Sequence, residues 1–145
     1  MNLQRLKEEQ IRNAMKVVTD DEVKAVKTIA GCDCAYYGNV VVSAVVVCDE
    51  GLKVVEKQTA AREADFPYIP GFLYYREGQA IIDAYSKLSI KPDVLIVDGN
   101  GILHPLRCGL ASQLGIVLKQ LTIGVTKSLL LGKVDADGNV IANNE

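Results

Sequence analysis

The chain has 145 residues, of which 49% are hydrophobic and 23% charged, as is typical of one globular domain with a substantial core. Its formal net charge of −2 at pH 7 argues against a protein held on nucleic acid by bulk positive charge alone. A local basic groove, or bound metal ions that supply the positive charge, remain open.

Neither membrane insertion nor secretion is expected. No apolar run approaches the roughly 18 residues of a membrane span, and the segment Met1–Glu9 is charged where a signal peptide is apolar. We therefore expect a cytoplasmic protein with no membrane partner. The four cysteines have no C-x-x-C spacing and stand among apolar residues. This pattern favours buried, reduced thiols over a zinc site.

The first half of the chain predicts one helix followed by an antiparallel meander. Residues 3–18 repeat apolar positions at the helical period. Strands are expected over 28–36, 40–48 and 52–60, because runs of strand-forming residues are separated by short turn sequences. The second of these strands is apolar at nearly every position, which is typical of a strand covered on both faces.

The second half predicts strand–helix–strand units: a helix over 71–88, a strand over 93–98, a helix over about 106–118 and a strand over 121–125. Hairpins followed by such units indicate an α/β fold with a mixed sheet and flanking helices. In this order the first strand is central, and strand 93–98 lies parallel beside it. A short hairpin is expected from Lys133 onward.

Three acidic residues stand where the local pattern favours apolar ones. Glu77 interrupts the apolar stripe of the helix over 71–88, Asp33 falls inside the first strand, and Asp98 closes strand 93–98. A carboxylate at a core-facing position is costly unless its charge is compensated. The expected topology brings Asp33 and Asp98 together on neighbouring strands, with Glu77 reaching in from the helix. A shared divalent metal is the simplest explanation.

Carboxylate ligands without a thiolate suit Mg²⁺ or Mn²⁺ better than zinc. Two such ions about 4 Å apart activate water and stabilise the leaving oxygen in phosphodiester cleavage. A structural alternative stays open for each acid. Asp33 would then lie at a bulge or sheet edge, Glu77 would pair with a nearby Lys or Arg, and Asp98 would cap the Gly-Asn-Gly turn.

Four sequence blocks resemble one known family. They are Ala-Gly-Cys-Asp-Cys-Ala-Tyr at 30–36, Phe-Pro-Tyr-Ile-Pro-Gly-Phe-Leu-Tyr-Tyr-Arg-Glu at 66–77, Asp-Val-Leu-Ile-Val-Asp-Gly-Asn-Gly-Ile-Leu-His-Pro at 93–105 and Ile-Gly-Val-Thr-Lys at 123–127. In these blocks the chain is similar to endonuclease V, the deoxyinosine-directed repair nuclease. The match runs in register from about residue 28 to residue 132.

This resemblance implies an RNase H-like fold and Mg²⁺-dependent cleavage of DNA one phosphodiester 3′ of a deaminated base, with Mn²⁺ able to substitute. Inosine-containing RNA is a second expected substrate. In that family the acids at the positions of Asp33, Glu77 and Asp98 bind the metal. These are the same three residues that conflict with the local pattern.

The segment Pro67-Tyr68-Ile69-Pro70-Gly71 predicts a stiff loop, because the two prolines fix φ on either side of an aromatic and an apolar residue. A rigid apolar wedge can enter a base stack, and a poorly paired base is cheaper to extract. By resemblance this segment separates the strands, with Tyr68 prominent. The structural alternative is that Tyr68 simply packs over the helix 71–88.

The loop Gly99-Asn100-Gly101 could present backbone amides to a phosphate or a flipped base. By resemblance its backbone lines the hypoxanthine pocket. The resemblance also places His104, the only histidine, near the scissile phosphate. Without the resemblance, a single histidine that precedes a proline would be interpreted as structural. Lys127 would by itself be a solvated strand end, and the resemblance places it close to the metal.

The expected organisation is one domain over 1–145: a helix and lead-in to residue 27, a family-matching core over 28–132 and a tail over 133–145 that resembles no family segment. Endonuclease V chains continue well beyond the position of Leu131. A lesion-binding module without catalysis is therefore an alternative function. A third hypothesis is another metal nuclease of the same fold, but its substrates need no wedge like that at 67–71.

Overall fold

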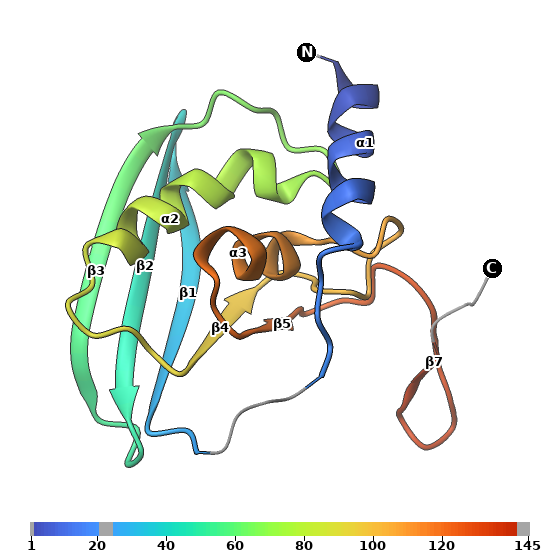
Figure 1. The fold of residues 1–145 in the computed structure, drawn as a ribbon. Coiled ribbons are helices and arrows are strands. Elements are labelled where there is room, and N and C mark those ends of the chain that lie inside the picture. Colours follow the sequence, from blue (N-terminus) through green and yellow to red (C-terminus); the bar gives the residue numbers. More distant parts are fainter. Residues whose placement is uncertain (1, 21–24, 142–145) are drawn as a thin grey trace.

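The computed structural model describes residues 2–20 and 25–141. Within them, a five-stranded sheet has the order β3-β2-β1-β4-β5, and a separate two-stranded hairpin follows it (Figure 1). Residues 1, 21–24 and 142–145 lie outside the described residues. They belong to the predicted lead-in before residue 28 and to the predicted tail.

The meander forms as the sequence predicts. Strands β1 (Thr28–Tyr37), β2 (Val40–Asp49) and β3 (Val54–Glu63) pair antiparallel in succession. Strand β3 begins later than predicted because Leu52 adopts a φ of 59° in the preceding turn, and a positive φ is incompatible with a strand. It also continues to Glu63, which still pairs with Val40.

Strands β4 (Val94–Asp98) and β5 (Thr122–Val125) extend the sheet on the other side of β1. Both pairings are parallel, so β1 is central and β4 lies beside it. These observations confirm the predicted α/β fold class, with its RNase H-like mixed sheet of an antiparallel meander followed by parallel strands. The last pair recorded between β1 and β4 is Cys32 with Val97.

Helix α1 (Leu3–Ala14) ends before the predicted residue 18, because the β-branched run Val17–Thr19 has poor helix propensity. Helix α3 (Leu110–Leu118) starts later than the predicted residue 106. The residues before it form an irregular loop, in which the amide of Gly109 donates to the carbonyl oxygen of Gly101 at 2.9 Å.

The predicted helix over 71–88 contains two kinds of turn. A π-helical segment, η1 (Tyr74–Gly78), leads directly into the α-helix α2 (Gln79–Ser86). A side chain at Gly78 would place its Cβ 2.5 Å from the ring of Tyr74, so only glycine fits there. Single π turns are frequent at functional sites, and this one carries Glu77.

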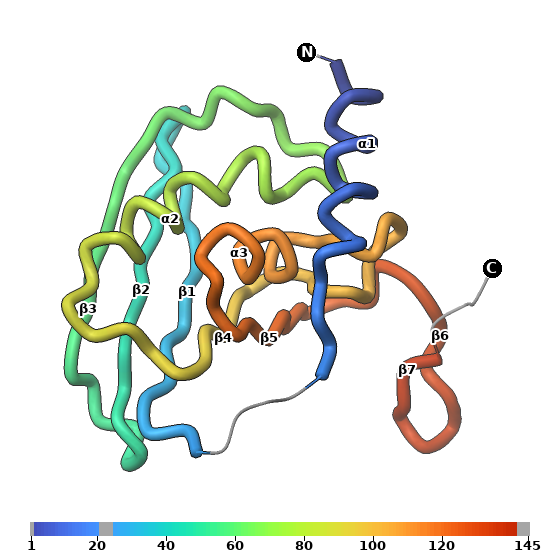
Figure 2. The backbone as a smooth tube through the Cα atoms, viewed as in Figure 1, coloured from blue at the N-terminus to red at the C-terminus, as the bar shows by residue number. Residues whose placement is uncertain are grey.

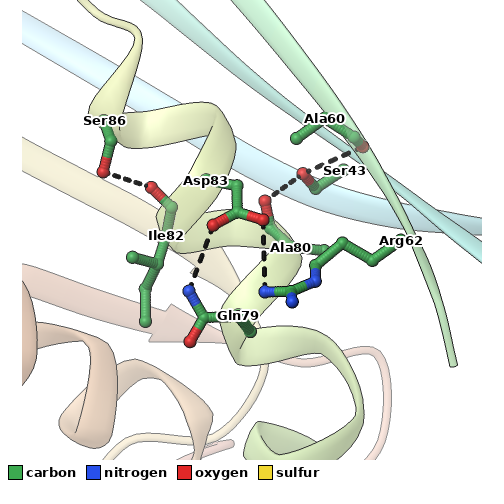
Figure 3. A network of polar contacts seen from close by, with 8 residues as sticks. All are labelled: Ser43, Ala60, Arg62, Gln79, Ala80, Ile82, Asp83 and Ser86. Carbon is green, nitrogen blue, oxygen red and sulfur yellow. Dashed lines mark hydrogen bonds and ion pairs between the residues drawn. The ribbon is translucent and has the colours of Figure 1, made fainter. Parts of the chain in front are cut away.

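Helices α2 and α3 cover one face of the sheet (Figure 1). Figure 3 shows how α2 is attached: the hydroxyl of Ser43 on β2 donates to the carbonyl oxygen of Ala80 at 2.6 Å, and Arg62 on β3 pairs with Asp83 at 3.3 Å. The core between these layers is built mainly from small and branched apolar side chains: Ala30, Val45, Val47, Ile81, Ala84, Leu95, Val97, Leu110 and Leu114.

The opposite face of the sheet has no helix over it among the described residues. Its side chains include four apolar residues that are between 36% and 53% exposed: Val42, Ile96, Ile123 and Val125. The prediction that strand 40–48 is covered on both faces is therefore wrong within the described part of the chain. The apolar pattern of β2 reflects one buried face and one open apolar face.

The expected hairpin near the end is present as β6 (Lys133–Val134) and β7 (Val140–Ile141), and it projects away from the five-stranded sheet (Figure 2). Among residues 2–20 and 25–141, no helix is long and apolar enough to cross a membrane.

Candidate active site

Asp33 and Asp98 occupy adjacent strands at the same end of the sheet. Each is the next residue after the paired Cys32 and Val97, so the parallel register places them side by side. Strand alternation buries Cys32 and Val97 on the helix face and directs both acids to the open face. Asp33 and Asp98 therefore lie next to each other on neighbouring strands, as the sequence predicts.

An open hollow of about 480 Å³ lies on this face, lined by Asp33, Asp98, Lys127, Thr126 and apolar residues of β1, β2, β4 and β5. The ammonium of Lys127 lies 3.8 Å from Oδ2 of Asp98, although its side chain is 93% exposed. The structure thus brings Lys127 to the acids, as expected.

Glu77 approaches the same end of the sheet from η1. Its residue is only 9% exposed, and its Oε1 accepts a 2.5 Å hydrogen bond from the hydroxyl of Tyr36. Burial raises the pKa of Glu77; the Tyr36 hydrogen bond opposes this, and the charges of Asp33 and Asp98 raise the pKa further. The charges of Asp33 and Asp98 are therefore close enough to affect Glu77, although Glu77 does not line the hollow.

The three acids match a hard divalent cation in chemistry. Protein groups occupy one oxygen of each carboxylate: Tyr36 binds Glu77, the amide of Cys34 binds Asp33, and Lys127 pairs with Asp98. The second oxygen of each has no protein partner within the described part of the chain. In the present arrangement, however, no three His, Cys, Asp or Glu side chains among the described residues are grouped to hold one ion. The residues fit a metal by type and placement, while their side chains do not converge on one point.

Two supporting residues were not identified from the sequence. Tyr36 anchors Glu77, and the guanidinium of Arg76 stacks 4.5 Å from the centre of the Tyr36 ring while donating to the carbonyl oxygen of Phe66. Burial and the hydrogen bond to Glu77 both raise the pKa of Tyr36. Strand alternation puts Tyr36 on the helix face, opposite to Asp33, and no local signal in the sequence pointed to its contact with Glu77.

The cysteines beside the acids are inert thiols. Burial, together with the neighbouring carboxylates, raises the pKa of Cys32 to about 12 and raises the pKa of Cys34 as well. All four cysteines are free. Cys32 and Cys108 are buried, as predicted, whereas Cys34 and Cys48 are only partly buried, so the prediction of buried thiols is confirmed for two of the four. A thiol held neutral is a poor metal ligand and nucleophile.

A second, smaller pocket of about 90 Å³ lies at the proline-bracketed segment. It is lined by Tyr68, Ile69, Pro70 and Gly71, by Asn100 and His104 from the loop after β4, and by residues of α1, η1, α3 and the segment after β5. Tyr68 is 69% exposed, so the alternative in which it packs over the following helix is wrong. Pro67 precedes this rim, and Gly99 and Gly101 flank Asn100 without lining the pocket.

Backbone packs tightly against backbone where the loop over 99–101 meets its neighbours. A Cβ at Gly109 would lie 2.2 Å from the carbonyl oxygen of Asn100, and one at Gly124 would lie 2.5 Å from that of Gly99. The loop over 99–101 therefore touches the start of α3 and strand β5 at once. The conformation of this loop therefore depends on glycine at positions 109 and 124, where a side chain would collide with its backbone.

His104 uses both ring nitrogens inside the protein. Its Nδ1 accepts from the amide of Leu106 at 3.1 Å, so Nε2 carries the proton and donates to the carbonyl oxygen of Gly71 at 3.0 Å. The residue is 3% exposed, and burial lowers its pKa although the bond to Gly71 opposes this. His104 lines the small pocket rather than the hollow that contains Asp33, Asp98 and Lys127.

The chain matches one protein family over most of its length. The sequence model of the family described as Endonuclease V covers residues 9–143. Over 118 residues the chain is 45% identical to the Endonuclease V of Roseiflexus sp. (strain RS-1), which covers 81% of this chain and 53% of that protein.

Solved structures agree with the sequence comparison. The Endonuclease V structure from Streptomyces avermitilis superposes with a TM-score of 0.83 at 36% identity, over 88% of this chain and 58% of that one. A second structure is that of Ciona intestinalis Endonuclease V (D234N) in complex with a 23mer DNA containing an inosine followed by a ribo-adenosine. It superposes with a TM-score of 0.78 at 30% identity, over 89% of this chain and 58% of that one. The chain spans about half the length of the curated relatives it matches.

Proposed function

Because this chain belongs to the endonuclease V family, we propose that it is a metal-dependent endonuclease acting on deaminated bases in DNA. The substrate is a strand with deoxyinosine, and the product is a nick on the 3′ side of the lesion. Inosine-containing RNA is a second proposed substrate.

The observation that carries this proposal is the placement of Asp33 and Asp98 next to each other on parallel strands, with Glu77 electrostatically coupled to both. Like charges gathered at one end of a sheet are unfavourable without a compensating cation. A structural role alone would not place all three acids there, since Asp33 lies in the central strand, away from the sheet edge and from the only bulge, between Val47 and Cys48, recorded in the pairing of the described strands.

We assign Asp33, Glu77 and Asp98 as the residues that would hold Mg²⁺, or Mn²⁺ in its place. When bound, the ion would activate water and stabilise the charge on the leaving oxygen. The protein's own contribution is to orient the acids. The amide of Cys34 and the hydroxyl of Tyr36 each hold one carboxylate in place. The exposed ammonium of Lys127 adds a positive charge beside Asp98 that attracts a phosphate.

Recognition of the lesion is assigned to the second pocket. The segment from Pro67 to Gly71 carries the exposed Tyr68 at its tip, where its ring can enter a gap in the base stack. The extracted base would then occupy the pocket beside Asn100, with Gly99 and Gly101 supplying backbone on either side. Its removal is easiest where pairing is weak, as at a deaminated purine.

His104 contributes to this recognition by holding the Gly71 carbonyl. A role at the scissile phosphate, as the family resemblance implies, would require the ring to release Gly71 or Leu106, because both nitrogens are engaged. The present geometry supports the role in the pocket.

The test is cleavage of a labelled duplex with one deoxyinosine, in Mg²⁺ and then in EDTA, beside an undamaged duplex and the Asp98→Ala variant. We expect a nick on the 3′ side that requires Mg²⁺, the lesion and Asp98. Selective binding without a nick would instead establish the lesion-binding module. Absence of both binding and cleavage would overturn the proposed function while leaving the fold unchanged.

A further inference from the structure

Gln10 is the one side chain of α1 that is buried, at 1% exposure, and it is polar. Its amide nitrogen donates to two carbonyl oxygens that are distant in sequence: that of Gly71 at 2.9 Å and that of Cys108 at 3.2 Å. Gly71 belongs to the proline-bracketed turn, and Cys108 precedes the first residues of α3. One side chain therefore connects two separate segments around the small pocket, which Gln10 itself also lines.

The peptide units that Gln10 holds are fixed on their other side as well. The amide of Phe72, which follows Gly71, donates to the carbonyl oxygen of Ile69 at 2.9 Å. The amide of Gly109, which follows Cys108, donates to the carbonyl oxygen of Gly101 at 2.9 Å. Both peptide planes are thus oriented, and Gln10 is a direct link between them.

The orientation of the Gln10 amide follows from these partners. Both are carbonyl oxygens, so they require the NH₂ group, and Oε1 is left buried with no hydrogen-bond partner among the described residues. An unpaired buried acceptor is unfavourable, and an apolar side chain of similar shape would avoid it. The glutamine is therefore a poor choice for packing alone, and its value lies in the two bonds that it donates.

We propose that Gln10 is a positioning residue that sets the spacing between the Gly71 and Gly109 walls of the base pocket and so determines its selectivity. This inference rests on the proposed function. The pocket wall includes two glycines, Gly71 and Gly109, which contribute only backbone to it. Backbone groups discriminate between bases only while their positions are held to well under 1 Å. Loss of the link should therefore reduce the preference for deoxyinosine more than it reduces overall binding to DNA.

The test compares Gln10→Met with Gln113→Met. Gln113 is a matched control: it is also 1% exposed, its side-chain amide has no partner among the described residues, and it lies on α3 outside the pocket lining. Two quantities are measured on the 145-residue chain. One is the ratio of dissociation constants for an undamaged and a deoxyinosine duplex, and the other is the hydrogen exchange of the Phe72 and Gly109 amides.

We expect Gln10→Met to lower the ratio about tenfold or more and to speed exchange at Phe72 and Gly109, with neither change in Gln113→Met. If Gln10→Met does not fold, Gln10→Asn replaces it, because the shorter amide cannot span both carbonyls. An unchanged ratio together with unchanged exchange would overturn the proposal. If the wild-type chain does not distinguish the two duplexes, the proposed function fails by itself. In that case the hydrogen exchange of the Phe72 and Gly109 amides still tests whether Gln10 links the two walls. Unchanged exchange in Gln10→Met would show that it does not.

Discussion

The hydroxyl of Tyr36 donates to Oε1 of Glu77 across 2.5 Å, and this bond joins the central strand to the π-helical turn. It is the contact that holds the nearly buried Glu77 carboxylate in place. The guanidinium of Arg76 stacks on the ring of the same tyrosine. Tyr36, Arg76 and Glu77 therefore form one connected unit whose disruption is measurable without any ligand.

Replacement of Tyr36 by Phe should destabilise the fold by about 1–3 kcal/mol at pH 7, because the Glu77 carboxylate loses its hydrogen bond while staying buried. Urea unfolding measures this free energy. Tyr37→Phe is the control, since Tyr37 is 85% exposed on the same strand. Equal effects of the two substitutions would show that the bond to Glu77 contributes nothing to stability.

Addition of MgCl₂ should raise the melting temperature of the chain, because an ion bound only by the folded state stabilises that state. The shift should disappear in Asp98→Asn, which removes a negative charge from the site. Asp65→Asn should keep the shift, because Asp65 is exposed and outside both pockets. A shift that persists in Asp98→Asn would place the ion elsewhere.

Replacement of Tyr68 by Ala should weaken binding to a deoxyinosine duplex while leaving the free energy of unfolding within about 0.5 kcal/mol of the wild-type value, as is usual for an exposed side chain. Tyr68 is 69% exposed. Fluorescence anisotropy on damaged and undamaged duplexes measures the first effect, with Tyr37→Ala as the control. Retention of lesion preference in Tyr68→Ala would exclude the wedge.

Stability should fall as the pH drops below about 6.5, and His104 should account for part of this loss. Burial lowers the pKa of His104 in the folded protein below its ordinary value of 6.5. The unfolded chain therefore takes up a proton before the folded one does, so the free energy of unfolding decreases as the pH falls through this range.

His104→Gln should show a shallower decrease over the same pH range, since glutamine does not titrate. Urea unfolding at pH 7.5, 6.5 and 5.5 would compare the two slopes (three points spaced about one unit apart suffice, because titration of one group spans roughly two units). Parallel slopes for the wild-type protein and the variant would contradict the buried, neutral state of His104.

Much of the architecture could be predicted from periodicity and turn sequences. The β-branched runs and the short turns at Gly38 and Gly51 are local signals, and they place three strands before any tertiary contact is known. The conflict between Asp33, Glu77 and Asp98 and their apolar surroundings was also visible locally. It identified the three acids that the sheet register and η1 bring to one end of the fold.

Other features depend on contacts between residues far apart in the chain. The pairing of Tyr36 with Glu77 spans 41 residues, and that of Gln10 with Cys108 spans 98. No local pattern encodes either pairing. The open apolar face of β2 shows the same limit, because an apolar strand pattern records which residues avoid water and not what covers them.

By itself, then, the amino-acid sequence indicated the order of the elements and the family, since these follow from local periodicity and from motifs contiguous in the chain. The parallel placement of Asp33 beside Asp98 was an expectation from the order of the strands, and the pairing of β1 with β4 confirms it. Only the tertiary structure decided that Glu77 lies on a π turn under Tyr36, that His104 points into the small pocket and that Gln10 joins two of its walls. The reason is physical: hydrogen bonds between distant segments depend on how the helices pack on the sheet, and packing is a property of the whole chain.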